Sequence, residues 1–179
     1  MKRICFGLLI SLCLPAVAKA DNYIGLNYLE TRYDERGFDT SKPTAWALRF
    51  GSALSENVAI EARLGSGASS DRLEIDPTTH ASLEIKQLFG VYARLMAPLG
   101  ERVTVYGLAG ITRVKLEASA RIHGVGVKVS ESETDLSIGV GVDLMLTTNG
   151  FINLEYALLQ SDDDAYDLDA LSIGVGLRF

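Results

Sequence analysis

The chain has 179 residues, of which 47% are hydrophobic and 22% charged, and its formal net charge is −6. This acidic balance argues against nucleic acid as a partner, because phosphate binding depends on an excess of basic residues. Beyond residue 20 no run of about 18 apolar residues occurs, so the sequence excludes a helical membrane span.

The first 20 residues have the pattern of a secretory signal peptide. A basic start at Lys2 and Arg3 is followed by an apolar stretch over residues 4–14, and Ala18-Lys19-Ala20 stands directly before Asp21. This A-x-A sequence predicts cleavage after residue 20, which leaves residues 21–179 as the exported domain.

Cleavage at this site changes the composition of what remains. The 159 residues of the exported domain have 14 basic and 23 acidic residues, which is a net charge of −9. Cys5 and Cys13 leave with the signal, so no disulfide is expected. Lipidation of Cys13 is a less favoured alternative, because Leu12 is large for the position before a lipidated cysteine.

Alternation of apolar with polar or small residues predicts eight strands in the exported domain. A period of two gives each strand two unlike faces. The pattern is clearest at the end, where apolar residues at the odd positions 171–179 alternate with small or polar residues at the even positions. In a membrane barrel the apolar face contacts lipid and the other face lines the interior. In chain order the predicted strands are residues 24–28, 46–50, 58–64, 83–95, 103–112, 136–146, 152–158 and 171–179.

The connections between these strands alternate in length. Three are short, at residues 54–57, 97–101 and 147–150. The others are longer and polar, at residues 34–43, 65–81, 117–134 and 161–167. Short turns on one side and long loops on the other are typical of outer-membrane barrels, with the short turns periplasmic. The predicted fold class is therefore all-β, an eight-stranded antiparallel up-and-down transmembrane β-barrel.

The long connection after the fifth strand is predicted to be part of a tall hairpin over residues 111–134. Its tip falls at His123-Gly124, a pair suited to a two-residue turn, and this register places Ala118 opposite Val129. Continued along the strand, the same register directs Val105 and Ile111 to lipid, Tyr106 and Leu108 to the interior, and the apolar face of the upper hairpin toward the barrel axis. A bulge would reverse these directions.

Charged residues on the inward faces form the main candidate site. In a barrel this narrow the interior is filled by side chains, so buried charges are expected to pair and to plug the lumen. A near repeat of residues 137–143 at 172–178 sets Asp143 and Arg178 at a similar depth. The alternative is a narrow or gated channel. The predicted interior network consists of Arg49, Glu61, Arg63, Glu84, Lys86, Arg94, Asp143, Glu155 and Arg178.

Other patterns give weaker indications of chemistry. The Gly-x-Gly pairs at 139–141 and 174–176 lie inside strands, where inward glycines make room, so no nucleotide or other cofactor is expected. The acidic run over residues 162–169 lacks the glycine and terminal glutamate of a calcium loop, so a solvated loop is favoured over a metal site.

A hydrolytic triad of His80, Ser82 and Glu84 is the enzymatic alternative. Membrane barrels that remove acyl chains from lipid A carry a His-x-Ser pair with a downstream acid. Strand parity here directs His80 and Ser82 inward, whereas acyl chains lie outside the barrel, and no matching acid follows at the longer spacing. The sequence therefore favours a protein without catalytic residues.

The chain resembles the eight-stranded outer-membrane barrel superfamily that includes OmpA-like barrel domains, OmpX-type proteins and opacity-type surface proteins. The resemblance rests on residues 105–110 (VYGLAG), the two Gly-x-Gly strands, residues 153–156 (NLEY) and the ending 176–179 (GLRF). It implies that the terminal aromatic, Phe179, is the assembly signal for the barrel-insertion machinery. Members serve as adhesion or immune-evasion proteins, structural barrels or small porins.

These observations together predict a non-enzymatic integral protein of a bacterial outer membrane with a plugged interior. Its expected partners are outer-membrane lipid, the barrel-insertion machinery and an extracellular ligand or host surface bound by the loops; the alternative to this last role is envelope structure. A narrow porin and a lipid A-modifying enzyme are the rival functions.

Overall fold

Nine antiparallel strands make up the regular structure of the computed structural model, which describes residues 22–35, 40–76, 79–122, 125–162 and 166–179. Within these residues the structure has no helix long and apolar enough to cross a membrane. The strands are β1 (Asn22–Glu35), β2 (Thr44–Ala53), β3 (Val58–Ser69), β4 (Asp71–Asp76), β5 (Thr79–Leu99), β6 (Val103–Ile122), β7 (Val125–Met145), β8 (Gly150–Asp162) and β9 (Tyr166–Arg178).

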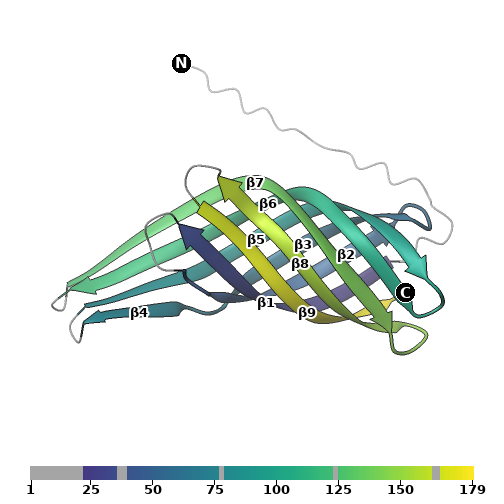
Figure 1. Cartoon of the computed structure of the whole chain (residues 1–179), viewed down its shortest axis with the longest axis horizontal. Coiled ribbons are helices and arrows are strands. Elements are labelled where there is room, and N and C mark those ends of the chain that lie inside the picture. The colour runs from purple at the N-terminus through teal and green to yellow at the C-terminus, as the bar shows by residue number, and fades with distance from the viewer. Residues whose placement is uncertain (1–21, 36–39, 77–78, 123–124, 163–165) are drawn as a thin grey trace, which may run out of the picture.

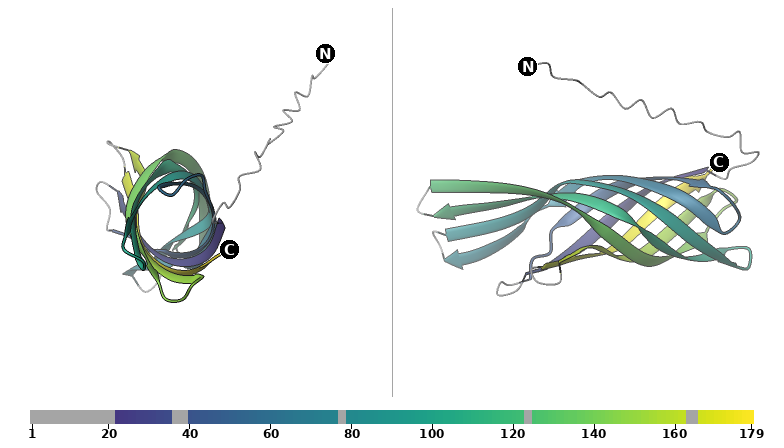
Figure 2. Two further views of the ribbon diagram at one scale, coloured as in Figure 1. Left: turned by 90° about the vertical axis from the view of Figure 1, so that its right-hand side faces the viewer. Right: turned by 90° about the horizontal axis from the view of Figure 1, so that it is seen from above.

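The nine strands occupy eight positions around a closed barrel, whose ring is visible end-on in Figure 2. β9 pairs with β1, from Tyr23 opposite Arg178 to Glu35 opposite Tyr166. β3 pairs with β5 from Val58 to Gly65, and β4 pairs with the N-terminal end of the same strand. β4 therefore follows β3 in one barrel position after a break at Ser70. This arrangement confirms the predicted eight-stranded up-and-down barrel.

Alternating burial gives each strand an outer apolar face and an inner face. In β9 the odd residues 171–177 are exposed apolar side chains, while the even residues 168–176 are buried. In β6, Val105 and Ile111 are exposed and Tyr106 and Leu108 are buried, as predicted. An exposed apolar band of this kind is stable when lipid covers it.

Four strands continue beyond the barrel as a sheet that projects to the left in Figure 1. β5 and β6 pair along their whole length, and β6 and β7 pair up to the hairpin end, with Ala118 opposite Val129 as predicted. β8 joins β7 only from Ile138. We call the projecting part the extension: β4 and residues 79–85, 114–122 and 125–135. Much of 65–81, expected as a loop, is therefore strand; His123-Gly124 lies outside the described residues.

A β-bulge between Ile85 and Gln87 reverses the faces of β5 at the base of the extension. Ile85 is fully buried, whereas the Glu84 and Lys86 side chains are more than one-third exposed and form an ion pair at 2.9 Å. The prediction that Glu84 and Lys86 belong to the interior network is therefore wrong. Alternation counted from the lower half of β5 holds only below the extra residue.

Inward glycines make room for the aromatic rings of residues paired with them on the neighbouring strand, as Tyr106 is with Gly141. A Cβ atom at Gly141 would lie 2.4 Å from the Tyr106 hydroxyl oxygen and 2.9 Å from the backbone oxygen of Leu154. Tyr106 cannot move away freely, because its hydroxyl donates a hydrogen bond to Glu155 (2.7 Å). The glycines on the inner faces of the strands are therefore needed for packing.

We predict that Gly141→Ala destabilises the barrel by about 1–3 kcal/mol, the usual range for overpacking a filled core. The measurement is urea unfolding of the protein in lipid vesicles, followed by tryptophan fluorescence. Gly107→Ala is the control, because its added Cβ would meet only one atom within 4 Å, the Gly139 carbonyl oxygen at 3.9 Å. Equal loss of stability in the two variants would contradict the proposed role of Gly141.

Candidate functional site

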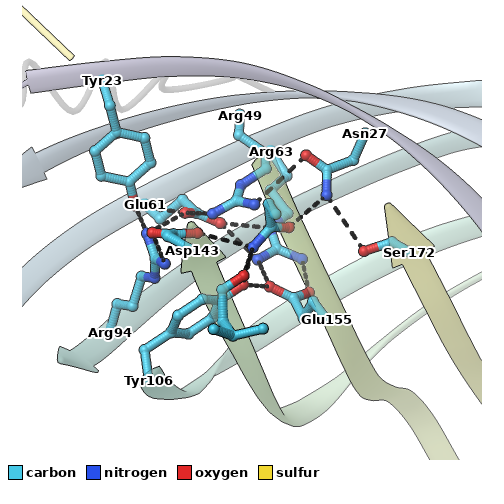
Figure 3. Close-up of polar contacts among 12 residues, drawn as sticks. Tyr23, Asn27, Arg49, Glu61, Arg63, Arg94, Tyr106, Asp143, Glu155 and Ser172 are labelled. Atoms are coloured by element: carbon cyan, nitrogen blue, oxygen red, sulfur yellow. Dashed lines mark hydrogen bonds and ion pairs between the residues drawn. The ribbon is translucent and has the colours of Figure 1, made fainter. Parts of the chain in front are cut away.

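Six charged side chains meet inside the barrel, and each is at most 3% exposed. They come from five strands and point inward because they occupy the buried parity of those strands. Figure 3 shows them gathered into one group with several polar neighbours. The six are Arg49 on β2, Glu61 and Arg63 on β3, Arg94 on β5, Asp143 on β7 and Glu155 on β8.

Glu61 lies at the centre of this group, held by three cations. Its Oε2 atom accepts a hydrogen bond from Arg49 Nη2 (2.8 Å) and lies 3.7 Å from Arg94 Nη1. Its Oε1 atom accepts from Arg63 Nε (2.6 Å), and the Tyr23 hydroxyl donates to Oε2 (2.5 Å). A fully buried carboxylate is stable only when such partners replace its lost hydration.

Glu155 forms a bidentate ion pair with Arg63, which also contacts Glu61. Arg63 Nη1 and Nη2 donate to Glu155 Oε1 and Oε2 at 2.5 and 2.7 Å. Bidentate pairing of this kind fixes both distance and orientation. Arg63 therefore links the two glutamates, and its guanidinium also lies over the Tyr92 ring, 4.6 Å from the centroid.

Asp143 completes the group toward the short-turn end of the barrel. Arg94 Nη2 donates to its Oδ2 atom (2.6 Å), and Asn153 Nδ2 donates to Oδ1 (2.9 Å). Arg178 Nη2 lies 3.7 Å from Asp143 Oδ2 and keeps 31% of its side chain exposed. The structure thus brings Arg178 to the edge of the network, beside the aspartate that the sequence repeat indicated.

The six buried charges balance, with three arginines against three carboxylates. Every one of them contacts an opposite charge within 4 Å. The network ties together strands that are far apart around the barrel, for example β3 and β8 through the pair of Arg63 with Glu155.

Uncharged polar residues complete the network, and they were not among the residues predicted for it. Asn27 Nδ2 donates to Asn153 Oδ1 (2.8 Å) and lies 3.3 Å from Ser172 Oγ, while Asn153 Nδ2 donates to the Tyr106 hydroxyl (2.7 Å). The alternation along the strands placed several of these polar residues on inner faces. Only the three-dimensional arrangement shows which of these residues hydrogen-bond to the buried charges.

An apolar layer lies next to the network on the side of the extension. On β1, β8 and β9 its members are the next inward residues along the strand, toward the extension, after the polar residues that belong to the network. A bulge at Leu158–Gln160 on β8, like the one on β5, hides part of this layer from a simple alternation. The buried members are Leu29, Ala45, Ala47, Ile85, Leu88, Val114, Ala157, Leu159, Leu168 and Ala170.

The proposed hydrolytic triad is not assembled among the described side chains. The Ser82 and Ser119 hydroxyl oxygens are 2.8 Å apart, and Glu84 accepts from Lys86. Because the adjacent Leu83 faces the inner side, Ser82 and Glu84 lie on the outer face, so the predicted inward direction of Ser82 is wrong. The His80 side chain is outside the described part of the structure.

The acidic loop before β9 is described only in part, since residues 163–165 are outside the described ranges. Asp167 accepts a hydrogen bond from Ser161 Oγ (2.6 Å). Over the described ranges, no group of three or more His, Cys, Asp or Glu residues is arranged to hold a metal ion.

Comparisons with known proteins agree with the barrel. A family model described as "Outer membrane protein beta-barrel domain" matches residues 4–179. Ail, the attachment invasion locus protein of Yersinia pestis, is 22% identical with a TM-score of 0.65, covering 90% of this chain and all of that one. A second Ail structure contains the heparin analogue sucrose octasulfate.

Two further solved structures have a similar fold. Neisserial surface protein A is 16% identical with a TM-score of 0.59, covering 88% of this chain and 97% of that one. The N-terminal barrel domain of Pseudomonas aeruginosa OprF has the same identity and TM-score, covering 90% of this chain and all of that one. At these identities the likeness shows the fold alone. No curated protein sequence matches the chain.

We predict that Glu61→Gln destabilises the barrel by about 3–5 kcal/mol, because it leaves buried arginines uncompensated. Vesicle-based urea unfolding measures the effect. Glu84→Gln, which makes the same change outside the network, is expected to have a much smaller effect. The double variant Glu61→Gln, Arg49→Met should recover part of the loss; no recovery would mean that Arg49 does not depend on Glu61.

Proposed function

Since the chain belongs to the family of outer membrane protein β-barrel domains, we propose that it is a non-enzymatic, non-conducting barrel whose extension contacts a partner outside the cell. The observation that carries this proposal is the contrast between the barrel and the extension that projects from it. The lumen is filled by a neutral ion network and an apolar layer, while four strands continue past it. A channel would need an open lumen and would have no use for such a filling.

The filled lumen supports the non-conducting part of the proposal. An ion crossing the barrel would have to separate Arg63 from Glu155 and Arg94 from Asp143, each pair being at most 4% exposed. It would then meet the cluster of buried apolar side chains around Ile85 and Leu168. Both steps are unfavourable for a hydrated ion.

The extension supports the contact role. Its inner face carries apolar side chains that the barrel does not cover, such as Val127 and Val129, which are 57% and 61% exposed. Along residues 125–135, β7 pairs with β6 on one side and no described strand covers its other edge. Exposed apolar surface and an open strand edge are features that proteins usually cover or use for binding.

Export and assembly form part of the same proposal: residues 1–20 are the cleaved signal, and Phe179 is the signal for the insertion machinery. Phe179 is suited to this role because its side chain is 71% exposed at the end of β9. Its backbone N–H donates to Asn22 O (2.9 Å), and Asn22 N–H donates in return (3.1 Å), so recognition and barrel closure involve the same residue.

We predict that the purified protein gives no conductance steps above background in planar lipid bilayers. Breaking the plug should change this result: Arg63→Ser combined with Glu155→Ser removes the bidentate pair and its bulk without leaving a net charge. Steps seen with the unchanged protein would establish the narrow-porin alternative. Unchanged lipid A mass after expression separates the proposal from the enzymatic alternative.

We also predict that shortening the extension abolishes binding to host cells. Residues 117–130 are replaced by an Asn-Gly turn joining Leu116 to Glu131, which lie opposite each other in the hairpin. Bacteria expressing this variant should adhere to cultured epithelial cells at least tenfold less. Heat-modified mobility on gels checks that the shortened barrel folds. Unchanged adhesion with a folded variant would contradict a contact role for the extension.

A further inference from the structure

A cavity of about 370 Å³ lies at the base of the extension, directly beyond the apolar layer. Its volume is within the range of about 300–1,000 Å³ that is usual for small-molecule sites. Val114 and Gln160 line its deepest part, where each is 1% exposed. The ion network lies further down the barrel, and the buried apolar layer, which includes Val114, lies between it and the cavity.

One wall of the cavity is apolar because the bulge in β5 turns Leu83 inward. Leu116 and Ala118 from β6 and Val129 from β7 continue this wall. Leu116 also packs against the buried apolar layer, which holds the wall in place. This surface suits an alkyl or aromatic group.

Beside this apolar wall the cavity is acidic and aromatic, because Glu131 pairs directly with Leu116 in the β6–β7 hairpin and the tyrosines come from β1 and β9. Glu131 and Glu133 line it, and no Lys or Arg is among the described residues that do so. The Tyr166 hydroxyl donates a hydrogen bond to Glu133, and the Tyr33 and Tyr166 rings lie 5.2 Å apart between centroids. Burial and the neighbouring Glu133 raise the pKa of Tyr166, so the hydroxyl stays protonated.

The basic residues nearby are on the other face of the same sheet. Lys128 pairs with Glu117 at 3.3 Å, and Arg113 donates to Ser132 Oγ at 3.0 Å. Alternation along β7 therefore sends Lys128 and Ser132 outward and the two glutamates inward. The result is a separation of charge across one sheet, with the negative side facing the cavity.

We propose that this cavity binds a small organic ammonium ion with a short alkyl or aryl body. The apolar body lies against Leu83, Leu116 and Val129, and the cationic head is held by the two glutamates and the tyrosine rings. Carboxylates and aromatic faces are the groups that bind quaternary and primary ammonium ions in proteins. An anion is excluded by the two carboxylates. This site goes beyond the proposed contact role, which does not require the cavity to be occupied.

The test uses the full exported chain in nanodiscs of zwitterionic lipid, with empty nanodiscs to subtract partitioning. Three probes of equal chain length are titrated by calorimetry or NMR: hexyltrimethylammonium, 1-hexanol and hexanesulfonate. Saturable binding of the cation is expected, with hexanol at least tenfold weaker and hexanesulfonate not bound. Equal binding of hexanol and the cation, or no saturable binding of the cation, would overturn the proposal.

Two matched double variants localise the binding. Glu131→Gln with Glu133→Gln should weaken hexyltrimethylammonium at least tenfold, whereas Glu56→Gln with Glu101→Gln, the same charge change at the short-turn end, should leave affinity unchanged. Equal weakening in both would mean a general charge effect and would overturn the site. Heat-modified gel mobility confirms folding. The ligand titration does not depend on adhesion. A failed adhesion experiment would therefore leave the cavity proposal standing, and a failed titration would leave the contact role standing.

Discussion

Compensation of the fully buried Glu61 carboxylate is the constraint on which the rest of the interior depends. Its oxygens are shared by Arg49 and Arg63, with Arg94 at 3.7 Å, so loss of its charge would remove the one ion-pair partner that Arg49 has among the described residues. Three arginines then require further carboxylates, which Glu155 and Asp143 supply from the opposite side of the barrel. The ion pairs thus join strands that the backbone connects only through their neighbours. Such a network determines how side chains fill the lumen more strictly than apolar packing would, because each charge needs a specific partner.

The second constraint is the change from polar to apolar filling along the barrel axis. Charges occupy the half near the short turns, and the layer around Ile85 and Leu168 occupies the half near the extension. The bulges at Ile85–Gln87 and Leu158–Gln160 fall at this change. On β5 the bulge buries Ile85 in the apolar layer, turns Leu83 toward the cavity and places Glu84 and Lys86 on the outer face. The cavity and the apolar layer therefore share residues, such as Val114.

Local alternation in the sequence was enough to predict the eight strands of the barrel wall, the register of the β6–β7 hairpin and the faces of Val105 and Tyr106, because each depends on neighbouring residues alone. It missed β4, which lies in a stretch expected as a loop. The bulge in β5 was not predictable in this way. Glu84 and Lys86 alternate regularly with their neighbours, and only the pairing of β5 with β6 shows that an extra residue is present. The ion-pair partner of each charge could not be predicted either, because partners such as Arg63 and Glu155 are 92 residues apart in the sequence. Tyr23 was not predicted to belong to the network because it is uncharged, although its hydroxyl donates a hydrogen bond to Glu61.

The stacking of network, apolar layer and cavity has a consequence for how the chain can vary. Below the layer, any change of charge must be matched on another strand, and any change of size meets rings packed on glycines such as Gly141. Above it, β5, β6 and β7 are held mainly by backbone pairing, which accepts almost any side chain. Glu131 and Glu133 lie in this less constrained part, and among the described residues no buried cation is paired with them. Their charge is therefore better explained by what enters the cavity than by what stabilises the barrel.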